Sequence, residues 1–254
     1  MNIVLISIVV LILLLAAGWA GLAVSKMLAE RHMTGESKGV VGQVSGLVSL
    51  LLALVLGTLV GVSYAYFSGQ LTDLQTFSAQ ILRLDQAMAQ YGPETKPMRD
   101  RLKEGIVNGY HAIWGGGEVS PEMLTVEGPL ANAQRISDYL ATLEPKTDAQ
   151  KAALATANTY NGMVEQSRLL MALQAASPPV SWVLVVIVTF WAVALFFAIG
   201  LFAERNELVV AALVFGALSI GLAVFLILEF GHPYTGLFKV DPAALEETIE
   251  FIDK

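Results

Sequence analysis

Four long runs of apolar residues dominate the hydrophobic pattern of the chain. They cover residues 3–24, 40–67, 180–203 and 208–228, and none of them contains a charged side chain. An α-helix rises about 1.5 Å per residue, so about 20 residues cross the ~30 Å hydrocarbon layer of a bilayer. The first run follows no Lys or Arg and exceeds the ~7–15 residues of a signal-peptide core, so we expect it to be retained. The pattern therefore predicts four transmembrane helices.

The region between the second and third runs shows helical periodicity instead. Its apolar residues recur at spacings of three and four, which is typical of helices with one buried face. The first such stripe follows the second run directly, so run and stripe are expected to form one helix of about 50 residues. Further helices are predicted over 97–114, from Leu130 to Pro145, and from a capping box at Thr147 and Gln150. We therefore expect an all-α polytopic membrane protein with a helical soluble domain.

The same pattern divides the chain into four segments. Transmembrane helices 1 and 2 occupy 1–67, a soluble helical bundle 68–179, transmembrane helices 3 and 4 180–229, and a C-terminal turn with a short amphipathic helix 230–254. An even number of spans places both termini and the bundle on one side of the membrane. The count of basic residues near the membrane does not decide which side, because it is four on the short connections (Lys26, Arg31, Lys38 and Arg205) and three on the opposite side (Arg83, Arg168 and Lys239).

Composition agrees with a membrane protein and excludes other classes. Hydrophobic residues make up 55% and charged residues 15% of the chain, against about 45–50% and about 25% in soluble domains. The net charge of −7 has the wrong sign for a nucleic-acid partner. There is no cysteine, which excludes disulfides and Cys-based zinc sites. The lipid bilayer is the first partner that the composition predicts.

The sequence presents no catalytic constellation. His32, His111 and His232 lie in three different segments, and no nucleophile elbow, P-loop or dinucleotide-binding fingerprint occurs. No charge lies inside a span, so an intramembrane proton relay is not expected. We expect no enzyme activity, no metal site and no cofactor.

Small residues mark one side of the second span. Two GxxxG motifs place glycines at four-residue spacing, which allows close approach of helix backbones in lipid. Two interpretations remain open: packing within one copy of the chain, or a helix that lines a pore or subunit interface. In the second case the hydroxyls of Ser45, Ser49, Thr58 and Ser63 would face water. The candidate residues are Gly42, Ser45, Gly46, Ser49, Ala53, Gly57 and Gly61.

The C-terminal segment has the chemistry of a structured turn. Pro233 fixes φ, Gly236 allows a positive φ, and Asp241 followed by Pro242 suits the N-cap and first position of a helix. Glu229 ends the fourth span and requires a polar partner or water. A frayed terminus is the alternative, but the turn chemistry favours a docked segment. The candidate residues are Glu229, Pro233, Tyr234, Gly236, Asp241 and Pro242.

This tail resembles the closing motif of the bestrophin-like domain proteins, a bacterial membrane family. An acidic residue after the last span, a Pro-aromatic-small-Gly turn and a Pro-x-x-Leu helix start occur within FLILEFGHPYTGLFKVDPAAL, residues 225–245. The middle segment Leu71–Leu84, ending in ILRLD at residues 81–85, also resembles the family's stretch after the second span. Two departures are that the family usually has Asp at Glu229, and Arg- and Glu-rich sequence in place of SGQLTDLQTFSAQ, residues 68–80. The resemblance implies similarity to oligomeric bestrophin anion channels with a pore along the second span, and a cytoplasmic location of the soluble helices and both termini.

Together these features predict a homo-oligomeric channel for ions or small solutes in the cell inner (plasma) membrane. A non-conducting membrane sensor or scaffold is the alternative, because receptors are also built as span, helical bundle and span. A stator-type proton channel is less favoured, since no span carries a protonatable residue. A ring with the second span at its axis supports a channel, whereas a dimer packed through the soluble helices supports a sensor.

Overall fold

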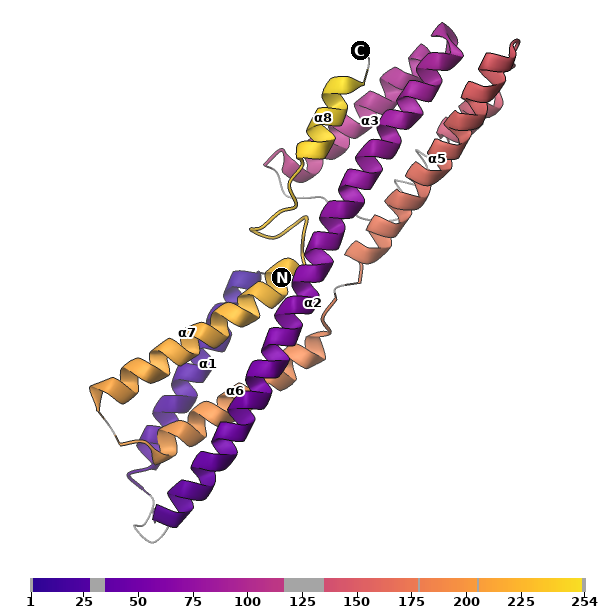
Figure 1. Cartoon of the computed structure of the whole chain (residues 1–254). Helices are drawn as coiled ribbons and strands as arrows, with labels where there is room; N and C mark the ends of the chain where they lie inside the picture. The colour runs from indigo at the N-terminus through magenta and orange to yellow at the C-terminus, as the bar shows by residue number, and fades with distance from the viewer. Residues whose placement is uncertain (1, 28–34, 117–134, 178, 205, 253–254) are drawn as a thin grey trace. The chain divides into compact units, whose positions relative to one another are not determined.

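Helices account for nearly all the regular structure in the computed structural model (Figure 1), which describes residues 2–27, 35–116, 135–177, 179–204 and 206–252. Within these ranges no strand occurs, and the predicted all-α class is confirmed. A further helix covers residues 135–141, while Leu130, where this helix was expected to begin, lies outside the described residues. The named helices are α1 Ile3–Val24, α2 Gly35–Tyr91, the 3₁₀ helix η2 Pro93–Thr95, α3 Lys96–Trp114, α5 Asp148–Ala175, α6 Trp182–Phe202, α7 Glu207–Phe230 and α8 Ala243–Phe251.

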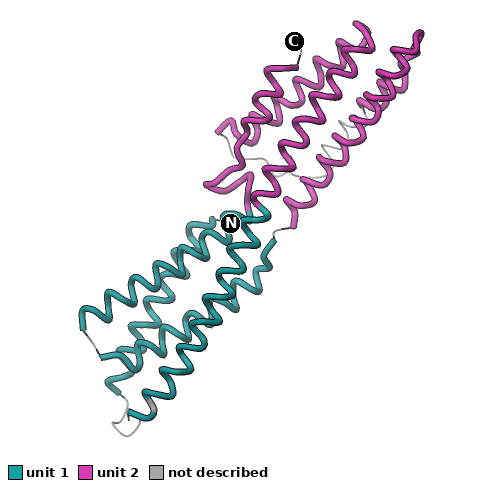
Figure 2. The backbone as a smooth tube through the Cα atoms, in the orientation of Figure 1, with its two compact units in different colours: residues 1–66, 179–231 teal, residues 67–178, 232–254 magenta. Residues whose placement is uncertain are grey.

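The chain folds into two compact units that alternate along the sequence (Figure 2). The first comprises Met1–Tyr66 and Pro179–Gly231, and the second comprises Phe67–Pro178 and His232–Lys254. Helix α2 is a single helix of 57 residues that contributes to both units. Gly69 does not interrupt it, although a helix-interior glycine costs about 1 kcal/mol.

The first unit contains α1, the first part of α2, α6 and α7. These are the four described helices that are long and apolar enough to cross a membrane, so the four predicted spans are confirmed. Side-chain oxygens of Asn2, Ser181 and Asn206 cap α1, α6 and α7 by accepting backbone N–H bonds. In the core, Leu14, Ala192 and Ala217 are fully buried.

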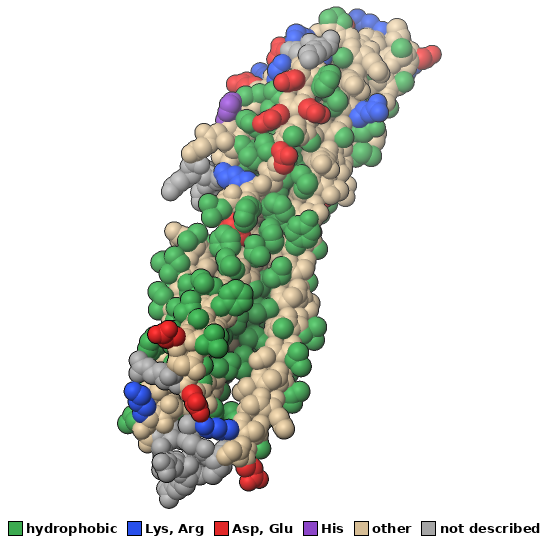
Figure 3. Space-filling view, turned by 60° about the vertical axis from the view of Figure 1, so that its left-hand side comes forward, with side chains coloured by type: hydrophobic (Ala, Val, Ile, Leu, Met, Phe, Trp, Pro, Cys, Tyr) green, Lys and Arg blue, Asp and Glu red, His purple; other side chains and the backbone are tan. Residues whose placement is uncertain are grey.

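The outer surface of the first unit is apolar, as expected for contact with lipid. Figure 3 shows hydrophobic side chains over its helices, with charged side chains on the second unit and at the ends of the spans. Leu54 is 67%, Phe190 68% and Phe215 74% exposed in the isolated chain. Such exposure is unfavourable in water and costs nothing in a hydrocarbon layer, so this unit is the membrane-embedded one.

Helices α1 and α6 touch backbone to backbone through glycines. A Cβ atom added at Gly200 of α6 would lie 2.2 Å from the Gly18 carbonyl oxygen of α1. One added at Gly21 of α1 would lie 2.2 Å from the Phe197 carbonyl oxygen of α6. Both distances are far below van der Waals contact, so only glycine permits this crossing.

The second unit is built from the rest of α2, α3, the helix at 135–141, α5 and α8. Its core includes the fully buried Ile81, Leu84 and Met88 of α2, with Leu140 and Ile252. The predicted cap of α5 is present, since the Thr147 Oγ1 accepts the Gln150 N–H at 3.1 Å. Gly92 at φ +142° makes the turn from α2 into η2, a conformation that L side chains rarely adopt.

A nearly buried ion pair joins α2 to α3. Arg99 donates from Nε to Asp85 Oδ1 at 2.7 Å and from a terminal nitrogen to Oδ2 at 2.9 Å. The two side chains are 14% and 4% exposed. This bidentate geometry satisfies both charges at once, and loss of one partner would leave the other uncompensated in the core. Asp85 belongs to the ILRLD segment, so the structure gives that acidic residue a role in holding α3.

Candidate functional site

The small-residue stripe of α2 (Gly42, Ser45, Gly46, Ser49, Ala53, Gly57 and Gly61) faces away from the core of the first unit. Its four glycines and Ala53 are exposed, and the two serines are half-buried. A Cβ added at any of the four glycines would meet no neighbouring atom within 4 Å. By contrast, Leu52 and Leu56 on another face of the same helix are buried in the core. Within the described residues, the glycines therefore pack against no other helix of the same chain.

The hydroxyls of this span divide into two groups. Ser49 Oγ donates to the Ser45 carbonyl at 2.7 Å, and Thr58 Oγ1 donates to the Leu54 carbonyl at 2.8 Å, so the helix itself satisfies both donors. Their oxygens keep lone pairs that can accept hydrogen bonds. The Ser63 hydroxyl, which would face water in the pore interpretation, is fully buried in the first unit.

The predicted tail residues occupy defined positions. Glu229 lies in the last turn of α7 and is 1% exposed, and Pro233 and Tyr234 are buried. The Tyr234 hydroxyl donates to Gln70 Oε1 of α2 at 3.0 Å. These positions belong to both units: Glu229 to the first, Pro233 and Tyr234 to the second.

Two details of the predicted turn differ in the structure. Gly236 has no positive φ, which among the described glycines occurs at Gly92 and Gly116; its N–H instead donates to the His232 carbonyl at 3.0 Å. Helix α8 begins at Ala243 with Pro242 at the N-cap, one residue later than predicted. Asp241 nonetheless accepts the Ala243 N–H at 3.1 Å, and Pro242 already has right-handed helical φ and ψ.

The segment after His232 packs against α3 and the core of the second unit. Trp114 Nε1 donates to the Val240 carbonyl at 2.9 Å, and Lys239 Nζ donates to the Ile113 carbonyl at 2.7 Å. Lys103 Nζ donates to the Ile252 carbonyl at 3.1 Å. Side chains of α3 thus donate to the backbone carbonyls of Val240 and Ile252, which fixes the position of the segment along α3.

A hydrogen bond to α8 shifts the pKa of Tyr110 in α3. The Tyr110 hydroxyl donates to Glu246 Oε1, and this hydrogen bond, with burial and the nearby negative charge, raises the pKa of Tyr110. A raised pKa in the folded state means that the contact contributes its full stability below the ordinary tyrosine pKa and loses it as the pH rises through the raised value. The contact is therefore intact at neutral pH.

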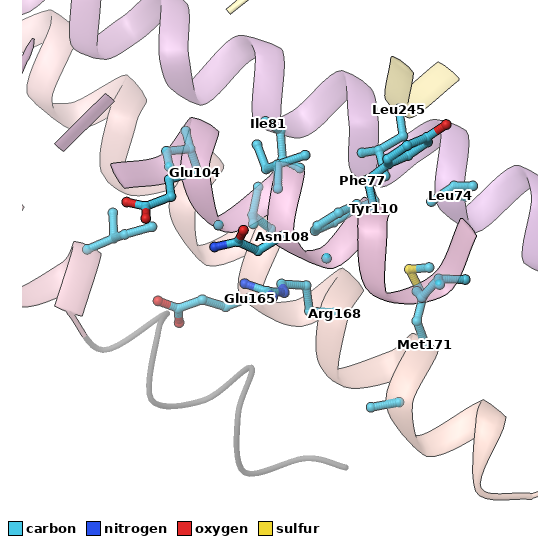
Figure 4. A pocket seen from close by; sticks show the side chains of 18 of the residues that line it. Leu74, Phe77, Ile81, Glu104, Asn108, Tyr110, Glu165, Arg168, Met171 and Leu245 are labelled. Atoms are coloured by element: carbon cyan, nitrogen blue, oxygen red, sulfur yellow. The ribbon is translucent and has the colours of Figure 1, made fainter. Parts of the chain in front are cut away.

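The second unit contains a cavity of about 840 Å³ that sequence reasoning did not predict (Figure 4). Helices α2, α3 and α5 and the tail supply most of its walls. The one available signal lies on α5, where Asn161, Glu165 and Arg168 follow each other at spacings of four and three and so share a helix face with apolar neighbours. Elsewhere in the described residues, no group of three or more His, Asp or Glu side chains is placed to hold a metal ion.

A comparison with known families decides the relationship. The Bestrophin-like domain matches residues 12–245, which is most of the chain. This protein belongs to the bestrophin-like domain family. The resemblance seen in the tail is thereby confirmed, and the matched range of this bestrophin-like protein contains the stripe, the cavity and the tail motif. No curated protein and no solved structure matches the chain.

Proposed function

We propose that this bestrophin-like protein is a homo-oligomeric channel for ions or small solutes, in which α2 of each copy lies along a shared axis. The observation that carries the proposal is the exposed small-residue stripe. Glycines inside a helix cost about 1 kcal/mol each, and in lipid they favour close helix contact. Since no helix among the described residues packs against them, a second copy of the chain is the occupant that fits.

The stripe also suits the lining of a narrow pathway. Small side chains leave room near an axis, and the lone pairs of Ser45, Ser49 and Thr58 offer sites for water or a passing ion. No charged residue lies between residues 40 and 67. A pore of this composition selects by diameter and by the cost of dehydration, and not by a ring of charge.

Replacing Gly57 or Gly61 with Leu tests the interface. We expect the oligomeric fraction in mild detergent to fall at least about tenfold, because a Leu side chain holds the helix backbones apart. Native mass spectrometry gives the subunit number, and ion flux into proteoliposomes should fall in parallel. Ala212→Leu, on the exposed face of α7, is the matched control for added bulk and should leave both readouts unchanged. Unaltered oligomers in both glycine variants would mean that the stripe faces lipid.

A non-conducting sensor or scaffold is the second candidate, and the cavity of the second unit favours it. Transmembrane receptors commonly carry a ligand pocket in a helical unit joined to their spans. The flux measurement separates the two candidates, because a sensor would assemble without conducting. A dimer without flux would replace the channel proposal with this one.

For location we propose the inner (plasma) membrane, with the second unit and both termini in the cytoplasm. The even number of spans and the family resemblance support this arrangement. The chain has no cysteine, so single cysteines at Asp148 and Glu247 in the second unit and at Glu204 between α6 and α7 report unambiguously. All three positions are exposed. An impermeant maleimide added outside intact cells should label only Glu204→Cys, and labelling of Asp148→Cys from outside would reverse the orientation.

A further inference from the structure

The cavity of the second unit has largely apolar walls. Leu74 and Phe77 of α2, Leu102 and Ile106 of α3, and Met171 of α5 all line it. Its volume of about 840 Å³ falls within the usual range of about 300–1,000 Å³ for small-molecule sites. An apolar cavity of this size buries most of a ligand's hydrocarbon surface.

The guanidinium of Arg168, for which the described residues supply no carboxylate partner, extends into this apolar space. Figure 4 shows Arg168 reaching from α5 into the cavity. Its guanidinium lies 6.0 Å from the centre of the Phe77 ring, and burial lowers the pKa of Arg168. In the part of the chain that the structure describes, no ion pair engages Arg168. A half-buried guanidinium is costly unless an anion accepts its hydrogen bonds.

The nearest acidic group on the same helix is already engaged. Glu165 Oε1 accepts hydrogen bonds from Ser137 Oγ at 2.9 Å and from Asn161 Nδ2 at 2.8 Å. Asn161 is 3% exposed, and its Oδ1 has no hydrogen-bond partner among the described residues. Among the described residues, the α5 wall of the cavity therefore offers an unused acceptor at Asn161 and a cation without an ion-pair partner at Arg168, which is the pattern of a polar ligand site.

We propose that this cavity binds an amphipathic carboxylate. The anionic head pairs with Arg168, the hydrocarbon part lies against Leu74, Phe77 and Met171, and a hydroxyl, amide or water donates to Asn161. Three arginines line the cavity against two glutamates, so the charge balance favours an anion over a cation (Arg101, Arg135 and Arg168; Glu104 and Glu165). The site does not depend on whether the protein conducts.

Quenching of Trp114 by 8-bromooctanoate tests the site directly. Trp114 lines the cavity, and replacing Trp19, Trp182 and Trp191 with Phe leaves it as the single tryptophan of the full-length protein. In lipid nanodiscs we expect saturable quenching by 8-bromooctanoate and at least tenfold weaker binding of 8-bromooctanol, which has the same chain without the charge. Quenching that rises linearly without saturation, or equally with both probes, would show partition into lipid only and overturn the proposal.

Matched arginine variants assign the charge. Arg168→Gln should lower the affinity for 8-bromooctanoate at least tenfold, whereas Arg168→Lys should retain most of that affinity. Arg83→Gln removes the same charge from an exposed position of the second unit that does not line the cavity, and should change affinity less than twofold. Circular dichroism of each variant reports folding. Equal weakening by Arg83→Gln and Arg168→Gln would reduce the effect to net charge and refute a site at Arg168.

Discussion

We expect Gly200→Leu to prevent the first unit from folding. The added Cβ alone would lie 2.2 Å from the Gly18 carbonyl oxygen and 3.2 Å from the Leu22 backbone nitrogen. Both are backbone atoms of α1, so no side-chain rotation relieves the collision and the helices must separate. Even Gly200→Ala should lower the free energy of unfolding by about 4 kcal/mol or more. A loss of this size is enough to unfold a marginally stable protein.

Recovery of monodisperse protein in mild detergent and its thermal unfolding temperature measure this effect. Gly162→Ala in α5 is the matched control, because a Cβ added at this exposed helix position, outside the stripe, meets no atom within 4 Å. The contrast with Gly57→Leu is also informative, since that variant should separate copies while each copy stays folded. Wild-type recovery of Gly200→Ala would mean that α1 and α6 do not cross at these glycines.

The second large effect is expected in the tail. Ile252 is 1% exposed in the core of the second unit, so Ile252→Ala should lower the free energy of unfolding by about 2–5 kcal/mol. Deleting residues 232–254 also removes Leu245 and Val240 from this core and should leave the second unit open to proteases. Limited proteolysis and the thermal unfolding temperature report both changes.

The neighbouring residue provides the control. Phe251 is 54% exposed, and Phe251→Ala should change stability by no more than about 0.5 kcal/mol. If native protein loses residues 232–254 to a protease as fast as an unfolded sample does, the tail is a frayed end. Equal effects of Ile252→Ala and Phe251→Ala would lead to the same conclusion.

The helices were predictable because their signals are local. Charge-free length located the four spans, and the first was predicted at the bounds that α1 has in the structure. The continuity of α2 followed from a stripe that begins where the second span ends. The start of α5 was predictable from Thr147 and Gln150, because a capping box is a sequence motif of only four residues.

The sites were less predictable because they join residues far apart in the chain. Nothing local indicates that Gly18 and Gly21 meet Gly200. The more regular GxxxG motifs of α2 instead contain glycines that contact no other helix in the described part of the chain. Likewise, the ion pair between Asp85 and Arg99 and the contact between Arg168 and the Phe77 ring form only when the helices pack together. Gly236 does not use the positive φ that a glycine allows, and its N–H donates to the His232 carbonyl within the turn.

The alternation of the two units along the chain sets an order of events during biosynthesis. The second unit begins at Phe67 but needs residues after His232 to complete its core, and α6 and α7 are made in between. At about 5–20 residues per second, synthesis of residues 179–254 takes several seconds. During this time the apolar faces of α2, α3 and α5 that the tail will cover remain exposed. The last two spans must enter the bilayer before the second unit closes. We therefore expect every premature stop after Pro178 to yield a chain with four or fewer spans and an unfinished second unit, which is a substrate for chaperones and proteases.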